Sequence, residues 1–462
     1  MTSARSATPA APRPAGGPKL PVYTGPFTAA HAERLLFRAG FGPRPGEAAQ
    51  LAKLGLDAAV RSLVRPVSSA LVGPAPSVDG HPLAPGDAWG HEGLWWLDRM
   101  VRSADPLTER LTLVFHDWFA TSDQSVEPRL MLAQNKTIRA HATGRFPALL
   151  LAVTKNPAML LWLNGTENDR DRPNENYARE LLELFALGAG RGYREQDVRE
   201  LARALSGFRN DWTDAGPTRF RFDPARHDGG VKTIFGHRGR YGWKDALRLV
   251  LAHPQHPAYF VRRLWDHFVP VAPPPRDAAA LAKLYRASGG QIRPVVEAIL
   301  RHPLLHEGPR MVKPPIVYLA GLLRAIERGV DTDTWSWQTE LMGQRLFTPP
   351  NVAGWDASRW IDTATWRGRW LVANTALEGR TLDPDPARTA FPVSLSAAQA
   401  VDRALAVLGG PTLSAATREH LERFSTDAIL KADRSWKLAP FSILRHNALL
   451  MLIATSPDLH TC

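Results

Sequence analysis

Apolar residues recur every three or four positions along most of this chain, which is the pattern of helices with one buried face. Clear examples lie in the stretches 28–40, 107–122, 193–208 and 243–329. Two stretches, about 209–242 and 345–370, lose this spacing and are rich in Gly, Pro and charged or Trp residues. The sequence therefore predicts a mainly α fold: a single large helical domain with two long irregular loops packed over it.

The stretch 174–188 divides most clearly into an apolar and a polar face. Its apolar positions are Tyr177, Leu181, Leu184 and Gly188, with Ala178, Leu182 and Phe185 beside them. Asn174 is expected to cap this helix and Gly188 to end it. A short turn to the next helical stretch favours antiparallel packing. The predicted core includes Leu181, Leu184, Phe185, Leu201 and Leu205, so Leu184→Asp is expected to prevent folding.

Composition narrows the class of protein. The chain has 462 residues, of which 44% are hydrophobic and 22% charged, as in ordinary soluble globular proteins. The net charge of +12 comes without a dense Lys/Arg block or a nucleic-acid motif, so we expect no nucleic-acid partner, only a general affinity for anions. A single cysteine, Cys462, argues against disulfides and Cys-based zinc sites. No nucleotide-binding glycine loop occurs, and no cofactor is predicted.

The N-terminal residues 1–26 are predicted to form a disordered tail before one domain, 27–462. The first 21 residues lack the apolar core of a signal peptide and a twin arginine. No apolar run reaches the ~20 residues that cross a bilayer. We therefore expect a cytoplasmic protein without a membrane span as the sequence is written, and an exported one if the true start lies upstream.

Polar residues gather in five motifs that we consider candidate sites. The predicted catalytic residues are Glu175, Glu180, Glu183, Asp197, Glu200, His116, His227 and Asp228. The predicted substrate-binding residues are Asn176, Arg179, Arg203, Lys232, Asn351, Trp355 and Trp360. Asp117 lies beside His116 within an otherwise apolar helix.

Three interpretations of these motifs stay open. Carboxylates at i and i+3, such as Glu180 and Glu183, favour general acid–base chemistry, as in a hydrolase or lyase acting on a glycan-like polymer. Trp residues of the second loop would then stack on sugars. Alternatively, the carboxylates and arginines form buried ion-pair networks in a non-catalytic helical scaffold or partner protein. A third interpretation has His116, His227, Asp228 and a Glu binding a divalent metal that activates water, although no HExxH or HxH spacing occurs.

Five motifs, in order, resemble those of the bacterial DUF1800 family, a domain of unknown function. They are LTERLTLVFHDWFATS, PNENYARELLELFALG, YREQDVRELARALSGF, RHDGGVKTIFG and TPPNVAGWDASRWIDTATWRGRW, and the resemblance covers roughly residues 28–458. It implies no established activity. It does imply a partner from the DUF1501 family, whose members resemble exported, sulfatase-like proteins. This chain departs from the family in lacking an export signal, in Arg194 where a Thr is usual, and in Asp117 where an Asn is common.

Overall fold

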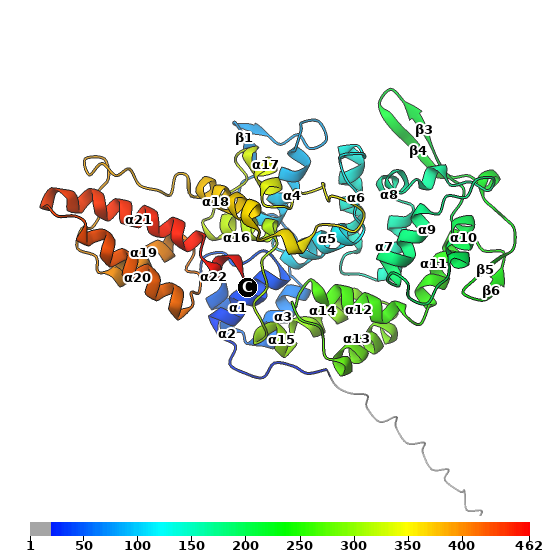
Figure 1. Cartoon of the computed structure of the whole chain (residues 1–462), viewed down its shortest axis with the longest axis horizontal. Helices are drawn as coiled ribbons and strands as arrows, with labels where there is room; N and C mark the ends of the chain where they lie inside the picture. Colours follow the sequence, from blue (N-terminus) through cyan, green and yellow to red (C-terminus); the bar gives the residue numbers. More distant parts are fainter. Residues whose placement is uncertain (1–19) are drawn as a thin grey trace, which may run out of the picture.

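The computed structural model describes residues 20–462, and most of the predicted tail lies outside this range. The fold is mainly α, as predicted (Figure 1). The first half of the chain contains α1 (Ala29–Ala39), α2 (Glu47–Lys53), α3 (Leu56–Val64), α4 (His91–Arg102), α5 (Pro106–Trp118), α6 (Pro128–His141), α7 (Phe146–Thr154), α8 (Pro157–Trp162), α9 (Asn176–Glu180) and α10 (Glu195–Ala204). A π-helix, η2 (Leu181–Ala186), follows α9 directly.

The second half is also helical. It contains α11 (Trp243–Ala252), α12 (His256–Asp266), α13 (Pro275–Ala287), α14 (Ile292–Leu300), α15 (Pro303–His306), α16 (Pro315–Ala325), α17 (Thr334–Leu341), α18 (Thr363–Leu377), α19 (Ala397–Val407), α20 (Ala415–Leu430), α21 (Leu438–Ala454) and α22 (Pro457–His460). In Figure 1 the helices α19–α21 form one end of the elongated molecule, and α9–α11 lie toward the other end. Helix α5 lies between them.

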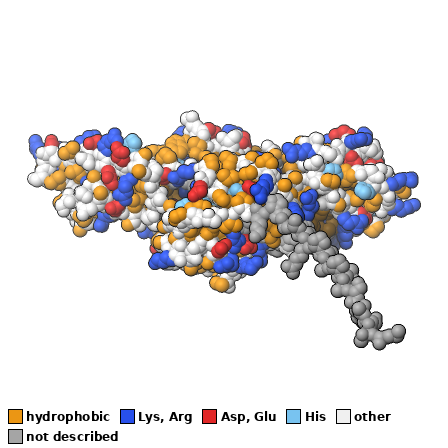
Figure 2. Space-filling view, turned by 90° about the horizontal axis from the view of Figure 1, so that it is seen from below, with side chains coloured by type: hydrophobic (Ala, Val, Ile, Leu, Met, Phe, Trp, Pro, Cys, Tyr) orange, Lys and Arg blue, Asp and Glu red, His pale blue; other side chains and the backbone are white. Residues whose placement is uncertain are grey.

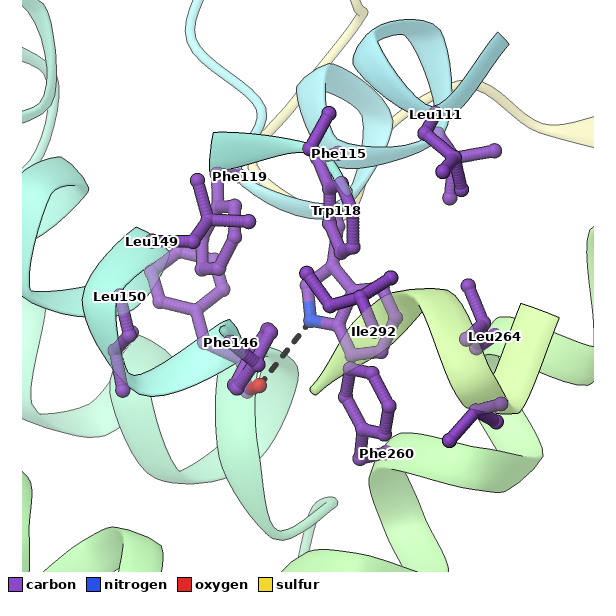
Figure 3. Packing of buried hydrophobic residues seen from close by; sticks show 14 of the residues in the cluster. Leu111, Phe115, Trp118, Phe119, Phe146, Leu149, Leu150, Phe260, Leu264 and Ile292 are labelled. Carbon is purple, nitrogen blue, oxygen red and sulfur yellow. Dashed lines mark hydrogen bonds between the residues drawn. The ribbon is translucent and has the colours of Figure 1, made fainter. Parts of the chain in front are cut away.

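Helix α5 joins two clusters of buried hydrophobic residues. Its Phe115 and Trp118 belong to the first cluster, where they pack on Phe146 and other rings from α7 and α12 (Figure 3). Leu113, on another side of the same helix, belongs to the second cluster with α4, α16 and α18. Asp105 caps the helix by accepting a hydrogen bond from the Thr108 backbone N–H at 3.1 Å. The helix is therefore buried almost all round.

The predicted helix over 174–188 forms, but half of it is a π-helix. The N–H of Leu187 donates to the carbonyl of Leu182, five residues back, at 3.0 Å. The wider turn moves later side chains around the axis, so Leu182 is fully buried and Leu184 only half-buried. Gly188 ends the helix at φ +94°, where glycine is unstrained. The prediction of Leu184 as a core residue was thus wrong, and the other four predicted core residues are buried.

The first predicted irregular loop contains two antiparallel hairpins. Strands β3 (Phe208–Thr213) and β4 (Gly216–Phe222) form the first, and β5 (Lys232–Ile234) and β6 (His237–Gly239) the second. In the second hairpin Ile234 pairs with His237. Strands β5 and β6 have three residues each, too few to show alternation, and β3 and β4 do not alternate cleanly between buried and exposed side chains. Another two-residue pair, β1 (Ser77–Val78) with β2 (His81–Pro82), lies before α4.

The second predicted irregular loop is shorter than expected. Helix α18 begins at Thr363, because the Asp362 carboxylate accepts a hydrogen bond from the Thr365 backbone N–H at 2.8 Å. The high Trp and Gly content of 363–370 hid this helix from the pattern. The remaining loop runs from about 343 to 362 and lies across α5.

Two terminal regions differ from the sequence-based picture. Tyr23 is buried, and its backbone N–H donates to the Arg301 carbonyl at 2.8 Å, so residues 20–26 pack on the domain that we expected to begin at 27. Within residues 20–462, one helical segment, Ser435–His460, is long and apolar enough to cross a membrane by length and composition. Half of its apolar window is buried inside the protein, as in a core helix.

The register of the π-helix can be tested with two leucines. We expect Leu182→Ala to lower the free energy of unfolding by about 2–5 kcal/mol, because it leaves a cavity in the core. Leu184→Ala should cost about 1 kcal/mol, since half of that side chain already contacts water. Urea denaturation of both variants measures the difference. An ordinary α-helix in this segment would instead make the Leu184 variant the less stable of the two.

Candidate functional site

The polar face of α9 is organised around Arg179. Its guanidinium lies 3.1 Å from the carboxylate of Glu175, 3.6 Å from that of Glu183 and 2.8 Å from that of Glu195, at the start of α10. All four side chains are at least partly exposed, so each pair contributes little to stability. Asn176 is exposed and donates from its amide to Asn164 at 3.1 Å. The face is a solvent-facing row of charges that links α9 to α10.

Glu180 differs from these carboxylates. Within residues 20–462 its carboxylate makes no hydrogen bond and no ion pair, although the side chain is partly buried. Burial, and then the neighbouring charge of Glu183, raise the pKa of Glu180 above its usual range. A Glu with a raised pKa beside a second, ion-paired Glu is the asymmetry that acid–base catalysis uses.

Side chains from other helices hold the π-helix η2, which contains Glu183, by hydrogen bonds to its carbonyl groups. The Tyr259 hydroxyl donates to the Leu184 carbonyl at 2.6 Å, and the Arg263 guanidinium donates to the same oxygen. The Phe185 carbonyl accepts from the Trp118 indole at 3.1 Å, the bond drawn in Figure 3. The ring of His256 lies 3.0 Å from the Ala186 carbonyl. Side chains of α5 and α12 therefore fix the helix that carries Glu183.

Two acidic residues of α10 hold the β5–β6 hairpin. Asp197 accepts hydrogen bonds from the backbone N–H of Phe235 at 2.7 Å and of Arg194 at 2.9 Å. Glu200 accepts from the Thr233 backbone N–H at 2.9 Å. Both carboxylates are thus occupied by backbone donors, and the hairpin is fastened to the helix.

A second ion-pair group lies beside that hairpin. Arg203 contacts Glu200 at 2.9 Å and Asp228 at 2.7 Å. Lys232 is buried, lies 3.8 Å from Asp228 and donates to the Gly230 carbonyl at 3.1 Å. His227 lies outside the pairs, with its Nδ1 3.0 Å from the Ser206 carbonyl. These contacts tie the 223–232 segment to α10.

The His116–Asp117 motif meets the second loop in the core. The ring of His116 is fully buried among Trp96, Phe347 and Trp355, and neither ring nitrogen has a hydrogen-bond partner within residues 20–462. Burial lowers the pKa of His116 to about 3, so the imidazole is neutral. Asp117 accepts a hydrogen bond from the Trp355 backbone N–H at 2.8 Å, and burial raises its pKa to about 6.

Close packing at Asp117 requires a glycine in the loop. Gly354 adopts φ +97°, and a Cβ added there would lie 2.3 Å from the Asp117 carboxylate. The loop can therefore approach α5 only through Gly354. Trp355 is 8% exposed and cannot offer its face to a sugar, contrary to prediction. Trp360 is half-buried and Asn351 exposed.

The predicted motifs thus form three groups and do not share one cleft. The α9 motif contacts the start of α10, the later α10 residues contact the 227–235 segment, and the α5 motif contacts the second loop. Among residues 20–462, no three or more His, Cys, Asp or Glu side chains are arranged to hold a metal ion. Tyr259, Arg263 and His256 were not among the predicted residues, because nothing in the sequence of α12 signals that a π-helix needs their hydrogen bonds.

The fold and these contacts define a mainly α-helical protein with a charged face on a helix that passes from α into π geometry. The profile of a family described as "Protein of unknown function (DUF1800)" matches residues 34–460. The chain belongs to this family. No curated protein and no solved structure matches the chain.

The buried carboxylate of Asp117 gives a pH-dependent prediction. Because its pKa is raised in the folded protein, folding favours the protonated form, and its ionisation destabilises the protein increasingly as the pH rises from about 4 to about 6. Asp117→Asn keeps the acceptor for Trp355 and removes the charge. We expect this variant to be more stable at pH 7.5 by on the order of 1–3 kcal/mol, and to lose the advantage at pH 4.

Urea denaturation of parent and variant at both pH values measures this effect. A variant that is less stable than the parent at pH 7.5 would mean that the Asp117 charge itself stabilises the fold.

Proposed function

We propose that the chain is a hydrolase or lyase that uses Glu180 as a general acid and Glu183 as its basic partner. The proposal is based on the difference between the two carboxylates. Glu180 has a raised pKa and no hydrogen-bond or ion-pair partner within residues 20–462, and Glu183 is ion-paired with Arg179. Such a pair holds the proton of one carboxyl group more tightly than an ordinary Glu does, beside a second carboxylate that contacts a guanidinium, which is the asymmetry that general acid–base catalysis uses. Glu175 would support Arg179.

The rigidity of the π-helix supports this proposal. Catalysis requires that the reacting groups keep their positions, and π-helical turns often occur at functional sites. Here three carbonyls of the turn, those of Leu184, Phe185 and Ala186, are bonded by side chains from other helices. The backbone at Glu183 is therefore fixed although its carboxylate faces solvent.

The openness of the site favours a polymer as substrate. Glu175, Asn176 and Arg179 lie along one helix edge and are partly or fully exposed. An extended chain can bind along such an edge without entering an enclosed pocket. A glycan-like polymer suits these groups, because amide, guanidinium and carboxylate groups all bond sugar hydroxyls. Trp355 takes no part in this proposal.

We assign a structural role to the other carboxylates. Asp197, Glu200 and Asp228 are occupied by backbone N–H groups or by Arg203, which favours a structural function. The scaffold interpretation therefore suits α10 and the β5–β6 hairpin. The metal-dependent alternative has no such support within residues 20–462. The cytoplasmic location and a DUF1501-family partner stay predictions.

Glu→Gln variants separate the two roles. Glu180→Gln should melt at the same temperature as the parent or higher, because it removes a charge that the site disfavours. Glu183→Gln should change stability little, since Arg179 keeps Glu175 and Glu195 as partners. As a matched control, Glu200→Gln should lose about 1.5–3 kcal/mol, because its charge accepts backbone and Arg203 hydrogen bonds. Thermal melts give these differences.

Activity is measured as release of reducing ends from polysaccharides by parent and variants. We expect both Glu180→Gln and Glu183→Gln to be folded and inactive. Strong destabilisation by both substitutions would reject the catalytic role and leave the helical scaffold.

A further inference from the structure

A groove of about 850 Å³ lies next to the charged face of α9. Its walls are the start of α10, the turn of the β5–β6 hairpin and the end of α11. In Figure 1 these elements form the end of the molecule opposite to α20 and α21. The lining residue Arg194 precedes Glu195, whose carboxylate contacts the Arg179 guanidinium at 2.8 Å, and Arg179 in turn lies 3.6 Å from the Glu183 carboxylate. Tyr193 also lines the groove, and burial raises the pKa of its phenol. The groove therefore adjoins the proposed acid–base pair.

Contacts within the protein hold both walls of the groove in place. Asp197 fixes the hairpin turn through the Phe235 N–H, as described above. On the opposite wall the His253 ring donates from Nε2 to the Gly192 carbonyl at 3.0 Å. Gly192 has φ +75°, and a Cβ there would lie 2.6 Å from the His253 ring. Both walls are thus held by contacts that leave little freedom.

The hairpin turn carries an unexpected aromatic residue. Phe235 has φ +49°, a left-handed conformation that bulky side chains disfavour, and Gly236 follows it at φ +81°. Asn-Gly is the relaxed sequence for such a two-residue turn. The Phe235 ring is half-buried and lies 4.9 Å from the His253 ring, along the groove. Strain of this kind clusters at functional sites.

Arg194 and Asp197 line the groove, and the Asp197 carboxylate already accepts two backbone hydrogen bonds. Arg191 and Arg238 are exposed and adjoin the lining residues Gly192 and His237 in sequence. None of these three guanidiniums makes an ion pair within residues 20–462. Figure 2 shows several Lys and Arg side chains at this end of the molecule. A guanidinium without an acidic partner in the wall of a groove attracts anionic ligands, and the two exposed arginines nearby in sequence add to the positive charge of this region.

We infer that this groove binds an acidic polysaccharide, with a sugar ring against Phe235 and Tyr193 and its carboxylate on Arg194. Aromatic rings suit the apolar faces of sugars, and guanidinium groups suit carboxylates. The inference rests on the proposed function, because it supplies the substrate class of the adjoining Glu180–Glu183 site. It also gives a reason for the strained turn: the ring is retained as a platform for the ligand.

Affinity electrophoresis of the full chain in gels with sodium alginate tests the inference. We expect alginate to retard the parent protein, and neutral dextran not to. Phe235→Asn should weaken alginate binding by roughly tenfold through loss of the stacked ring. Because Asn accepts the left-handed conformation, this variant should melt at the same temperature as the parent or higher. Arg194→Gln should weaken binding and reduce its dependence on salt.

Trp212→Ser serves as the control, since Trp212 is an exposed aromatic residue of the other hairpin and should not affect binding. Equal retardation of the parent, Phe235→Asn and Arg194→Gln would overturn the inference, as would absence of retardation. Equal binding of oligo-dT would also overturn it, because the groove would then be a nucleic-acid site. Alginate binding that persists in a destabilised Glu180→Gln variant would reject the catalytic proposal and retain the groove.

Discussion

The structure depends on the satisfaction of carbonyl groups in the π-helix η2. A π-turn shifts the backbone hydrogen bonds by one residue, and its last carbonyls point into the core, where an unpaired acceptor is costly. Trp118, Tyr259, Arg263 and His256 supply the missing donors. Their parent helices, α5 and α12, are thereby fixed against α9. The hydrogen bonds to the buried carbonyl groups of η2 therefore determine the position of the charged face of α9.

Much of the fold could be predicted from the hydrophobic pattern, because long amphipathic helices such as α5 and α10 repeat their burial over several turns. The hydrophobic pattern gave wrong predictions where the backbone departs from the regular spacing of an α-helix or a long strand. Leu184 was misplaced because a π-turn has no sequence signal of its own. The strands of the first hairpin of 208–239 do not alternate cleanly in burial, and those of the second are too short to do so. The first turns of helix α18 were predicted as loop, although Asp362 is a typical N-cap residue.

The sequence shows which polar residues are candidates for a site, but not how the fold arranges them. A sequence shows which carboxylates are near in the chain, so the closeness of Glu180 to Glu183 could be expected. The ion pair that joins α9 to α10, Arg179 with Glu195, was not predicted. The sequence does not show which carboxylates already accept hydrogen bonds from other parts of the fold. Asp197 and Glu200 accept backbone hydrogen bonds from a hairpin over thirty residues away, and His116 is enclosed by rings from α4 and from the second loop. These partners are set by tertiary structure alone.

The place of α5 between the two hydrophobic clusters has a consequence for how the chain can be divided. Its Phe115 and Trp118 face one cluster and Leu113 the other, so neither half of the molecule contains a complete core without this helix. A fragment ending before α5, or beginning after it, would expose a broad apolar surface and aggregate. Truncation within either long loop would separate elements that pack on the same thirteen-residue helix.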